Sequence, residues 1–282
     1  MSATSSVSPT RAFFRLEIAD SLRSRWVTFT AAVYVVVFGS FVWLGLRESS
    51  VLGFTGLSRV VLNVSNAVVI VLPLVSLVAT SQTIVRARTT GFFELLLAQP
   101  CRRRDWFRAV LASRLAVIVA PLVALLLVTL LAGAWAGETA LTPLVVRSTL
   151  CVTSLVWAFV GVGLLISAIA PTSERATVYA LLAWLTASAL HDFALIGLLL
   201  RARVAPAAVF GLAALNPVEA ARLAILGGID PELSILGPVG FWLVNTLGPR
   251  WTLLVGVGWP ALLGTACAWV ALRRFERSDL VG

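Results

Sequence analysis

The sequence predicts an all-α integral membrane protein with six transmembrane helices. Its 282 residues are 59% hydrophobic and only 12% charged, and a soluble domain of this length cannot bury so much apolar surface. The apolar runs are long and unbroken, unlike the alternating segments of a transmembrane β-barrel. Helices also satisfy their own backbone hydrogen bonds in lipid. We therefore expect residues 1–282 to form one transmembrane domain.

The first expected element is a helix within residues 1–25 that lies in the headgroup layer. In this segment arginines flank an apolar row, and a polar row lies on the opposite side. The apolar row is Phe14, Ile18 and Leu22, and the polar row is Glu17, Asp20, Ser21 and Ser24. This amphipathic pattern is typical of interfacial helices. The alternative is a plain cytoplasmic extension of the first span.

Six apolar segments are long enough to cross a bilayer, which takes about 20 helical residues. We expect these spans at 26–46, 60–85, 109–135, 150–170, 177–200 and 251–272. If the N-terminus lies inside the cell, most of the 22 arginines fall in inward-facing segments. Because positively charged loops are retained in the cytoplasm, both termini are predicted to lie there, with the protein in the inner (cytoplasmic) membrane.

The loop at 86–108, between the second and third spans, has an unusual composition. Six arginines crowd its two ends, and a short apolar block, 92–98, lies between them. The block is too short to span, and Pro100 ends it because proline does not continue a helix. One interpretation is a short helix held against the inner membrane face and offered to a partner. The other is a tight turn whose arginines only anchor the neighbouring spans.

The segment at 201–250 is apolar but repeatedly interrupted by glycine and proline. Asn216, Pro217 and Glu219 have the pattern of a helix N-cap, a first helical residue and an acid in the first turn. Two glycines at 227–228 are expected to end that helix. Since none of these pieces can span, we expect re-entrant or outer-leaflet helices that cap the bundle. A small extracytoplasmic cap packed on the membrane is the alternative.

His191 and Asp192 lie inside the predicted fifth span. A charge at that depth costs at least ~2.5–3.5 kcal/mol on insertion scales, so a partner or water is expected. Three interpretations are a structural ion pair, the lining of a polar path, and an acid/base site. For the first, we predict that Asp192 pairs with an arginine of the outer segment, Arg222.

Three further polar residues lie near span ends. Asn63 and Asn66, near the start of the second span, are expected to form structural hydrogen bonds between helices. Arg114, near the inner end of the third span, is expected to extend its guanidinium to the interface without a protein partner.

Several chemistries are excluded by residue usage. All 22 basic residues are arginine, so a phosphate-binding loop, which needs a lysine, cannot exist in this chain. The cysteines, Cys101, Cys151 and Cys267, are far apart, and there is one histidine. We therefore expect no metal or other cofactor on this chain. The formal charge of +9 is explained by arginines at span ends and does not indicate nucleic-acid binding.

Residues 91–100, Gly-Phe-Phe-Glu-Leu-Leu-Leu-Ala-Gln-Pro, resemble the G-[TS]-[LM]-E-x-L-L-[SA]-x-P segment of ABC-2-type transporter permeases. In that family the segment forms the cytoplasmic helix that docks on the ATPase subunit. The resemblance implies the same role for Gly91, Phe92, Phe93, Glu94, Leu95, Leu96, Leu97, Ala98 and Pro100.

Further stretches resemble one branch, the NosY-type permeases of nitrous oxide reductase maturation. These stretches are Ile166-Ser167-Ala168, Glu174-Arg175-Ala176-Thr177, Asp192-Phe193-Ala194-Leu195-Ile196-Gly197, and Asn216-Pro217 followed by Arg222-Leu223. Their order, spacing and span count agree over nearly the whole chain. At the docking edge the chain departs from its relatives. Arg86 and Arg88 stand where relatives usually place an acid, and Phe92 replaces a small hydroxyl residue.

The resemblance implies a homodimer of permeases on two copies of an ABC ATPase, which would bind ATP and Mg²⁺. The chain itself would then not be an enzyme. In the NosY-like case, the motion would serve an extracytoplasmic accessory protein that handles copper or sulfur. Three alternatives remain: an ABC-2 exporter of a lipid, peptide or drug; an intramembrane enzyme that uses His191 and Asp192; and a stand-alone proton-coupled carrier.

Overall fold

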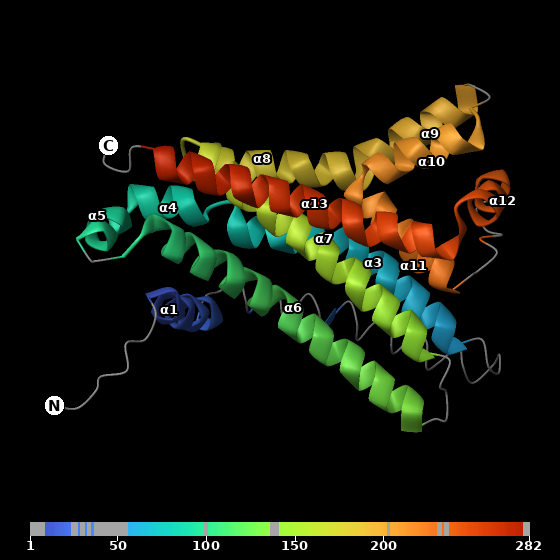
Figure 1. Cartoon of the computed structure of the whole chain (residues 1–282), viewed down its shortest axis with the longest axis horizontal. Helices are drawn as coiled ribbons and strands as arrows, with labels where there is room; N and C mark the ends of the chain where they lie inside the picture. The colour runs from blue at the N-terminus through green and yellow to red at the C-terminus, as the bar shows by residue number, and fades with distance from the viewer. Residues whose placement is uncertain are drawn as a thin grey trace.

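The computed structural model describes most of the chain, with gaps around the first predicted span and in several loops. The described residues are 9–23, 28, 32, 35–36, 56–98, 101–135, 141–201, 204–229, 233 and 237–278. Within these ranges every regular element is helical (Figure 1). The predicted first span at 26–46 lies almost wholly outside them, so its helix stays a prediction.

The helices before the central loop and around it are α1 (Pro9–Arg23), α3 (Gly56–Thr80), α4 (Thr83–Thr89) and α5 (Phe92–Leu97). The following long helices are α6 (Arg103–Trp135) and α7 (Leu141–Ile169). The next span is built from α8 (Ser173–Leu185), the π-helix η1 (Thr186–Leu190) and α9 (His191–Arg201). The chain ends with α10 (Pro206–Leu215), α11 (Pro217–Ile229), α12 (Gly237–Thr246) and α13 (Gly248–Arg277).

Five helical segments of the described chain are long and apolar enough to cross a membrane. They correspond to the second to sixth predicted spans. The pair α10–α11 is bent by 118° and would make a sixth segment if counted as one broken span. Several helices are longer than the predicted spans. For example, α13 begins at Gly248 and ends at Arg277, because a helix continues past the apolar stretch that hydropathy detects.

Helix α7 lies at the centre of the bundle and packs against α13, α3, α11 and α6 (Figure 1). The contact between α7 and α13 depends on two glycines. A Cβ atom added to Gly264 would lie 2.6 Å from the carbonyl oxygen of Trp157, and one added to Gly161 would lie 2.3 Å from that of Gly264. Small residues at such crossings let helix backbones approach closely, which favours association in lipid.

Helix α1, α5 and the end of α13 lie at one end of the bundle, and α12 lies at the other (Figure 1). Helix α1 packs against α6, and Glu17 and Ser21 of its polar row face Arg114. Arg114 of α6 is 8% exposed and donates to Ser21 Oγ at 2.9 Å, with Glu17 Oε2 3.6 Å away. The prediction that Arg114 needs no partner is wrong, because α1 covers the guanidinium before it can reach an interface. Burial raises the pKa of Glu17, and the positive charge of Arg114 opposes this rise.

Candidate functional site

The short helix α5 is anchored on one side and open on the other. Phe93 and Leu96, one helical turn apart, are 1% and 5% exposed. Leu95 is 72% exposed and Phe92 is 36% exposed. Gly91, which precedes the helix, has φ = 69°, a left-handed conformation that costs glycine little and other residues more. The tight turn at Gly91 therefore sets the direction of α5.

Phe93, on the buried side of α5, packs in an aromatic cluster with Trp106, Phe107 and Phe275. The partly exposed ring of Phe92 lies at the edge of this cluster, 5.9 Å from the rings of Phe93 and Trp106. The ring of Phe93 lies 5.1 Å from the rings of both Trp106 and Phe275. Trp106 and Phe275 are themselves 5.4 Å apart. Each such pair contributes roughly 0.5–1.5 kcal/mol beyond burial alone. The cluster thus joins α5 to the start of α6 and the end of α13.

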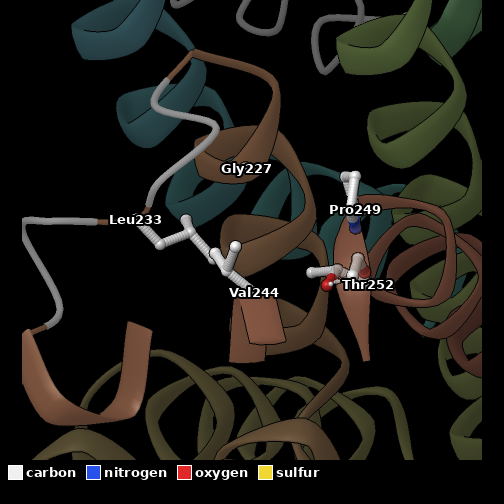
Figure 2. Close-up of a pocket in the computed structure, with 6 residues that line it drawn as sticks. Gly227, Leu233, Val244, Pro249 and Thr252 are labelled. Atoms are coloured by element: carbon white, nitrogen blue, oxygen red, sulfur yellow. Dashed lines mark hydrogen bonds between the residues drawn. The ribbon is translucent and has the colours of Figure 1, made fainter. Parts of the chain in front are cut away.

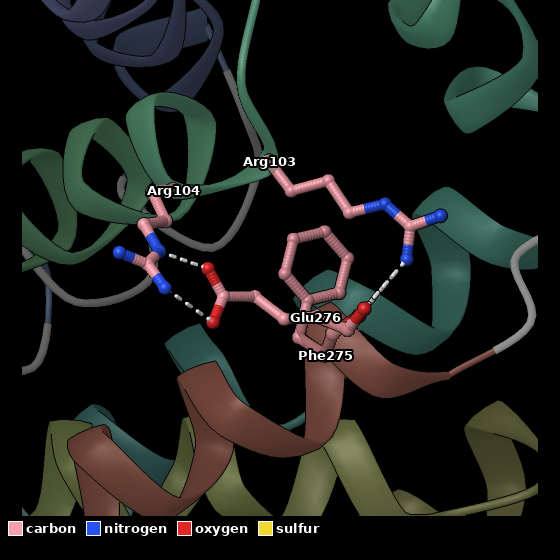
Figure 3. Close-up of polar contacts among 4 residues, drawn as sticks. All are labelled: Arg103, Arg104, Phe275 and Glu276. Atoms are coloured by element: carbon pink, nitrogen blue, oxygen red, sulfur yellow. Dashed lines mark hydrogen bonds and ion pairs between the residues drawn. The ribbon is translucent and has the colours of Figure 1, made fainter.

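Two arginines of the loop reinforce this junction (Figure 3). Arg103 Nη1 donates to the carbonyls of Phe275, Glu276 and Ser278 at 3.5, 3.1 and 3.1 Å. The last carbonyls of a helix have no partner within the helix, so a cation here stabilises the end of α13. Arg104 forms a two-pronged ion pair with the carboxylate of Glu276.

Helix α4, which leads into α5, is held by contacts with α7 and α8. Span two breaks after Thr80, and α4 begins at Thr83. The free backbone N–H groups of Ile84 and Val85 donate to Ser167 Oγ of α7 at 2.8 and 3.2 Å. The side chain of Gln82 donates to Thr177 Oγ1 of α8 at 2.6 Å. Ser167 therefore acts as the cap that α4 lacks in its own sequence.

A second polar group lies near the other end of the bundle. Arg222 Nη1 lies 3.3 Å from Asp192 Oδ2, so the predicted ion pair is present. Arg222 also pairs with Glu219 one turn earlier in α11. Asp192 Oδ1 and His191 Nε2 are buried without a hydrogen-bond partner in the described part of the chain. One cation thus faces two carboxylates at the point where α9 meets α11.

Asn216 caps α11 and also ties the start of this helix to the π-helix η1. Its Oδ1 accepts from Val218 N at 3.0 Å, which is the predicted N-cap at the start of α11. Its Nδ2 donates at 2.6 Å to the carbonyl of Ala187, inside the π-helix η1. A π-turn leaves backbone groups without their usual partner, and π-turns frequently mark functional sites. His191 and Asp192 follow η1 directly and take their orientation from it.

Helix α11 ends at Ile229, one residue beyond the glycines 227–228 at which the sequence predicts its end. Arg147 of α7 explains the two glycines. Its Nε donates to the carbonyl of Ala224 at 2.5 Å, and a Cβ on Gly228 would lie 2.7 Å from its Cδ. The glycines thus make room for an arginine. Nearby, Gly227, Leu233, Val244, Pro249 and Thr252 line a small, mostly apolar pocket together with Gly248 (Figure 2).

Some predicted residues lie beyond what the structure describes. Pro100 is outside the described residues, and the side chains of Leu97, Asn63 and Asn66 are outside them as well. Of the described side chains, no three or more His, Cys, Asp or Glu residues are grouped so that they could hold a metal ion.

The sequence of the chain is similar to known membrane transport proteins. The sequence matches the family described as "ABC-2 family transporter protein" over residues 11–280. The chain belongs to the ABC-2 transporter family. Over 89 residues it is 28% identical to "Probable ABC transporter permease protein NosY" of Pseudomonas aeruginosa, and this alignment covers 32% of each chain. The chain therefore matches about a third of that relative's length. The resemblance to ABC-2 permeases is confirmed, and the partial match supports the NosY-like branch.

Membership of the ABC-2 family makes the chain a membrane transport component and implies an ABC ATPase partner. The docking segment that the motif predicts is the helix α5. The sequence did not indicate which residues hold this region in place. Trp106 and Phe275 pack against α5, Arg103 bonds the end of α13, and Ser167 caps α4. Trp106 and Phe275 each stand beside arginines in the sequence, which was the available signal, but aromatic residues at a membrane interface have the same pattern.

Proposed function

We propose that this chain is the membrane-spanning subunit of an ABC complex and is moved by ATP hydrolysis in two separate ATPase subunits. The observation that carries the proposal is that α5 is buried on one side and exposed on the other. Phe93 and Leu96 are fixed in the protein, and Phe92 and Leu95 are left open at the end of the bundle. An anchored helix with an exposed apolar side fits a groove on a partner protein.

A push on α5 would reach the spans along two routes. The aromatic cluster connects α5 to the start of α6 and the end of α13, and Arg103 ties the start of α6 to the same end of α13. Ser167 and Thr177 connect the preceding helix α4 to α7 and α8. Since packed helices move as near-rigid bodies, displacement of α5 would tilt α13 and α7 together. The chain would thus transmit work that the ATPase supplies.

The complex would contain two copies of this chain, two ATPase subunits, and ATP with Mg²⁺ held by the ATPase. A symmetric pair gives the second half of a path or lever that one copy lacks. In a single copy, large apolar side chains of the span α8–η1–α9, such as Phe193 and Leu200, are exposed, and lipid or the second copy would cover them. We place the complex in the cytoplasmic membrane, with both termini and α5 in the cytoplasm.

The NosY-like role is the finer part of the proposal. In this role, the motion serves an extracytoplasmic accessory protein that delivers copper or sulfur during nitrous oxide reductase maturation. The partial match to NosY supports it. The alternative is an exporter of a lipid, peptide or drug. A cell lacking the chain would fail to assemble the reductase copper centre in the first case and would lose export of a hydrophobic cargo in the second.

The test is purification of the tagged full-length chain from its native membranes in mild detergent. We expect an ABC ATPase to co-purify, and Leu95→Glu to abolish its capture while the chain remains inserted. Leu16→Glu is the matched control, because Leu16 of α1 is 66% exposed at the same end of the bundle. Full function of the purified chain without an ATPase, or unchanged capture by the Leu95→Glu variant, would contradict the proposal.

A further inference from the structure

The arginines around α5 fall into two groups. Arg103 and Arg104 are bound within the chain, on the carbonyls of α13 and on Glu276. The remaining arginines of the loop, Arg86, Arg88, Arg102 and Arg108, form no ion pair with any described residue. Arg88 Nε is buried and has no acceptor in the described part of the chain. A buried donor without an acceptor is costly, so an acceptor from outside is expected.

The first group explains the fold of the loop, and the second has no role in it. Arg86 and Arg88 are in the last turn of α4, separated from α5 only by Thr90 and Gly91. Arg102 is exposed just beyond the other end of α5. Arg86, Arg88 and Arg102 therefore bracket α5 in the sequence.

One acid lies within this bracket. Glu94 is exposed on α5 and forms no ion pair with a described residue. Asp105 accepts a hydrogen bond from Thr10 of α1 and lies on α6. The segment 86–102 around α5 consequently carries an excess of positive charge. A complementary surface must be apolar at its centre and acidic at its rim.

We propose that the ATPase surface which receives α5 is an apolar pocket for Phe92 and Leu95 with an acidic rim that faces Arg86, Arg88 and Arg102. This inference rests on the proposed function and adds the charge of the partner to it. The position of α5 favours a protein over lipid headgroups, because the helix lies at the extreme end of the bundle, beyond the ends of α6 and α13 (Figure 1). The charge of the rim would decide which ATPase fits.

The experiment uses the ATPase that co-purifies with the wild-type chain, expressed and purified separately. Its affinity for the full-length chain in nanodiscs of phosphatidylcholine is measured between low and high salt. We expect Arg86→Glu/Arg88→Glu to weaken binding about tenfold at low salt and to flatten the salt dependence, since the Debye length falls from ~10 Å at 0.1 M to ~3 Å at 1 M. Arg175→Glu is the matched control, because Arg175 is exposed at the start of α8 and outside the bracket; it should change affinity less than twofold.

If the glutamate variant fails to insert, the variant Arg86→Gln/Arg88→Gln tests the proposal instead. Its affinity for the ATPase should lie between that of the wild type and that of the glutamate variant. Replacing rim acids of the ATPase with arginine should restore binding to the glutamate pair. Unchanged affinity and salt dependence in the arginine variants, while Leu95→Glu still abolishes capture, would overturn only this inference. An effect of the variants confined to nanodiscs with anionic lipid would also overturn it and assign the arginines to the membrane. Absence of any ATPase from the wild-type preparation would overturn the proposed function itself.

Discussion

The ring of Phe93 in α5 lies 5.1 Å from the ring of Phe275 in the last turns of α13. Both side chains are 1% exposed. This contact joins α5 to the C-terminal span, which packs against α7. The ring of Phe275 also lies 6.2 Å from that of Phe107. Phe275 is therefore the residue through which α5 and α13 share one rigid unit.

Phe275→Ala should destabilise the protein by roughly 3–5 kcal/mol, because it removes a buried ring and leaves a cavity among aromatic neighbours. It should also lower stimulation of the partner's ATP hydrolysis, since α5 loses its contact with α13. Thermal unfolding in detergent checks the first effect and ATPase rates in nanodiscs check the second. Phe241→Ala is the control, because Phe241 is 73% exposed. Equal melting temperatures for the two variants would contradict the packing argument.

Arg103→Gln should destabilise the end of α13 by about 1.5–3 kcal/mol, the range for hydrogen bonds made by a charged group. The guanidinium serves three carbonyls there. Hydrogen–deuterium exchange of residues 274–278 should accelerate in this variant. Arg104→Gln is the neighbouring control and should leave the melting temperature unchanged, because exposed ion pairs are screened by water. A larger effect of Arg104→Gln than of Arg103→Gln would reverse our assignment of the two arginines.

Ser167→Ala should loosen α4, because the buried N–H groups of Ile84 and Val85 lose their shared acceptor. Each unsatisfied donor costs about 1–3 kcal/mol. We expect faster amide exchange at these two residues and weaker coupling of ATP hydrolysis to function. Ser154→Ala is the control, since Ser154 only donates to the carbonyl of Val257 and no N–H is left without an acceptor. Amide protection at Ile84 that survives Ser167→Ala would rule out the cap.

Arg222→Met should be more destabilising than Glu219→Gln. The first change leaves the carboxylates of Asp192 and Glu219 facing each other without their cation, and the second retains the pair of Arg222 with Asp192. We expect about 1–3 kcal/mol for Arg222→Met, below the full cost of breaking a buried pair, because Arg222 and Asp192 are 26% and 31% exposed. The double variant Asp192→Asn/Arg222→Met should recover part of the loss. Purely additive effects in this cycle would show that the two side chains do not interact.

The sequence predicted the pairing of Asp192 with Arg222 for a general reason. A carboxylate within an apolar span needs a cation, and few cations lie close enough to the outer side to reach it. The cap by Asn216 was predictable for a local reason, since the side chain bonds a backbone group two residues later. The second bond of Asn216, to Ala187, was not predictable, because it depends on the π-turn in another helix.

The class of this protein, its second to sixth spans and the short helix α5 follow from the amino-acid sequence, because apolar length and the breaks made by proline and glycine are local properties of the chain. The anchoring of α5 by Phe275, the capping of α4 by Ser167 and the covering of Arg114 by α1 depend on how the helices pack. These contacts join segments far apart in the chain. Many aromatic, serine and arginine side chains could have made them, and helix packing around the glycines of α7 and α13 selects the ones that meet.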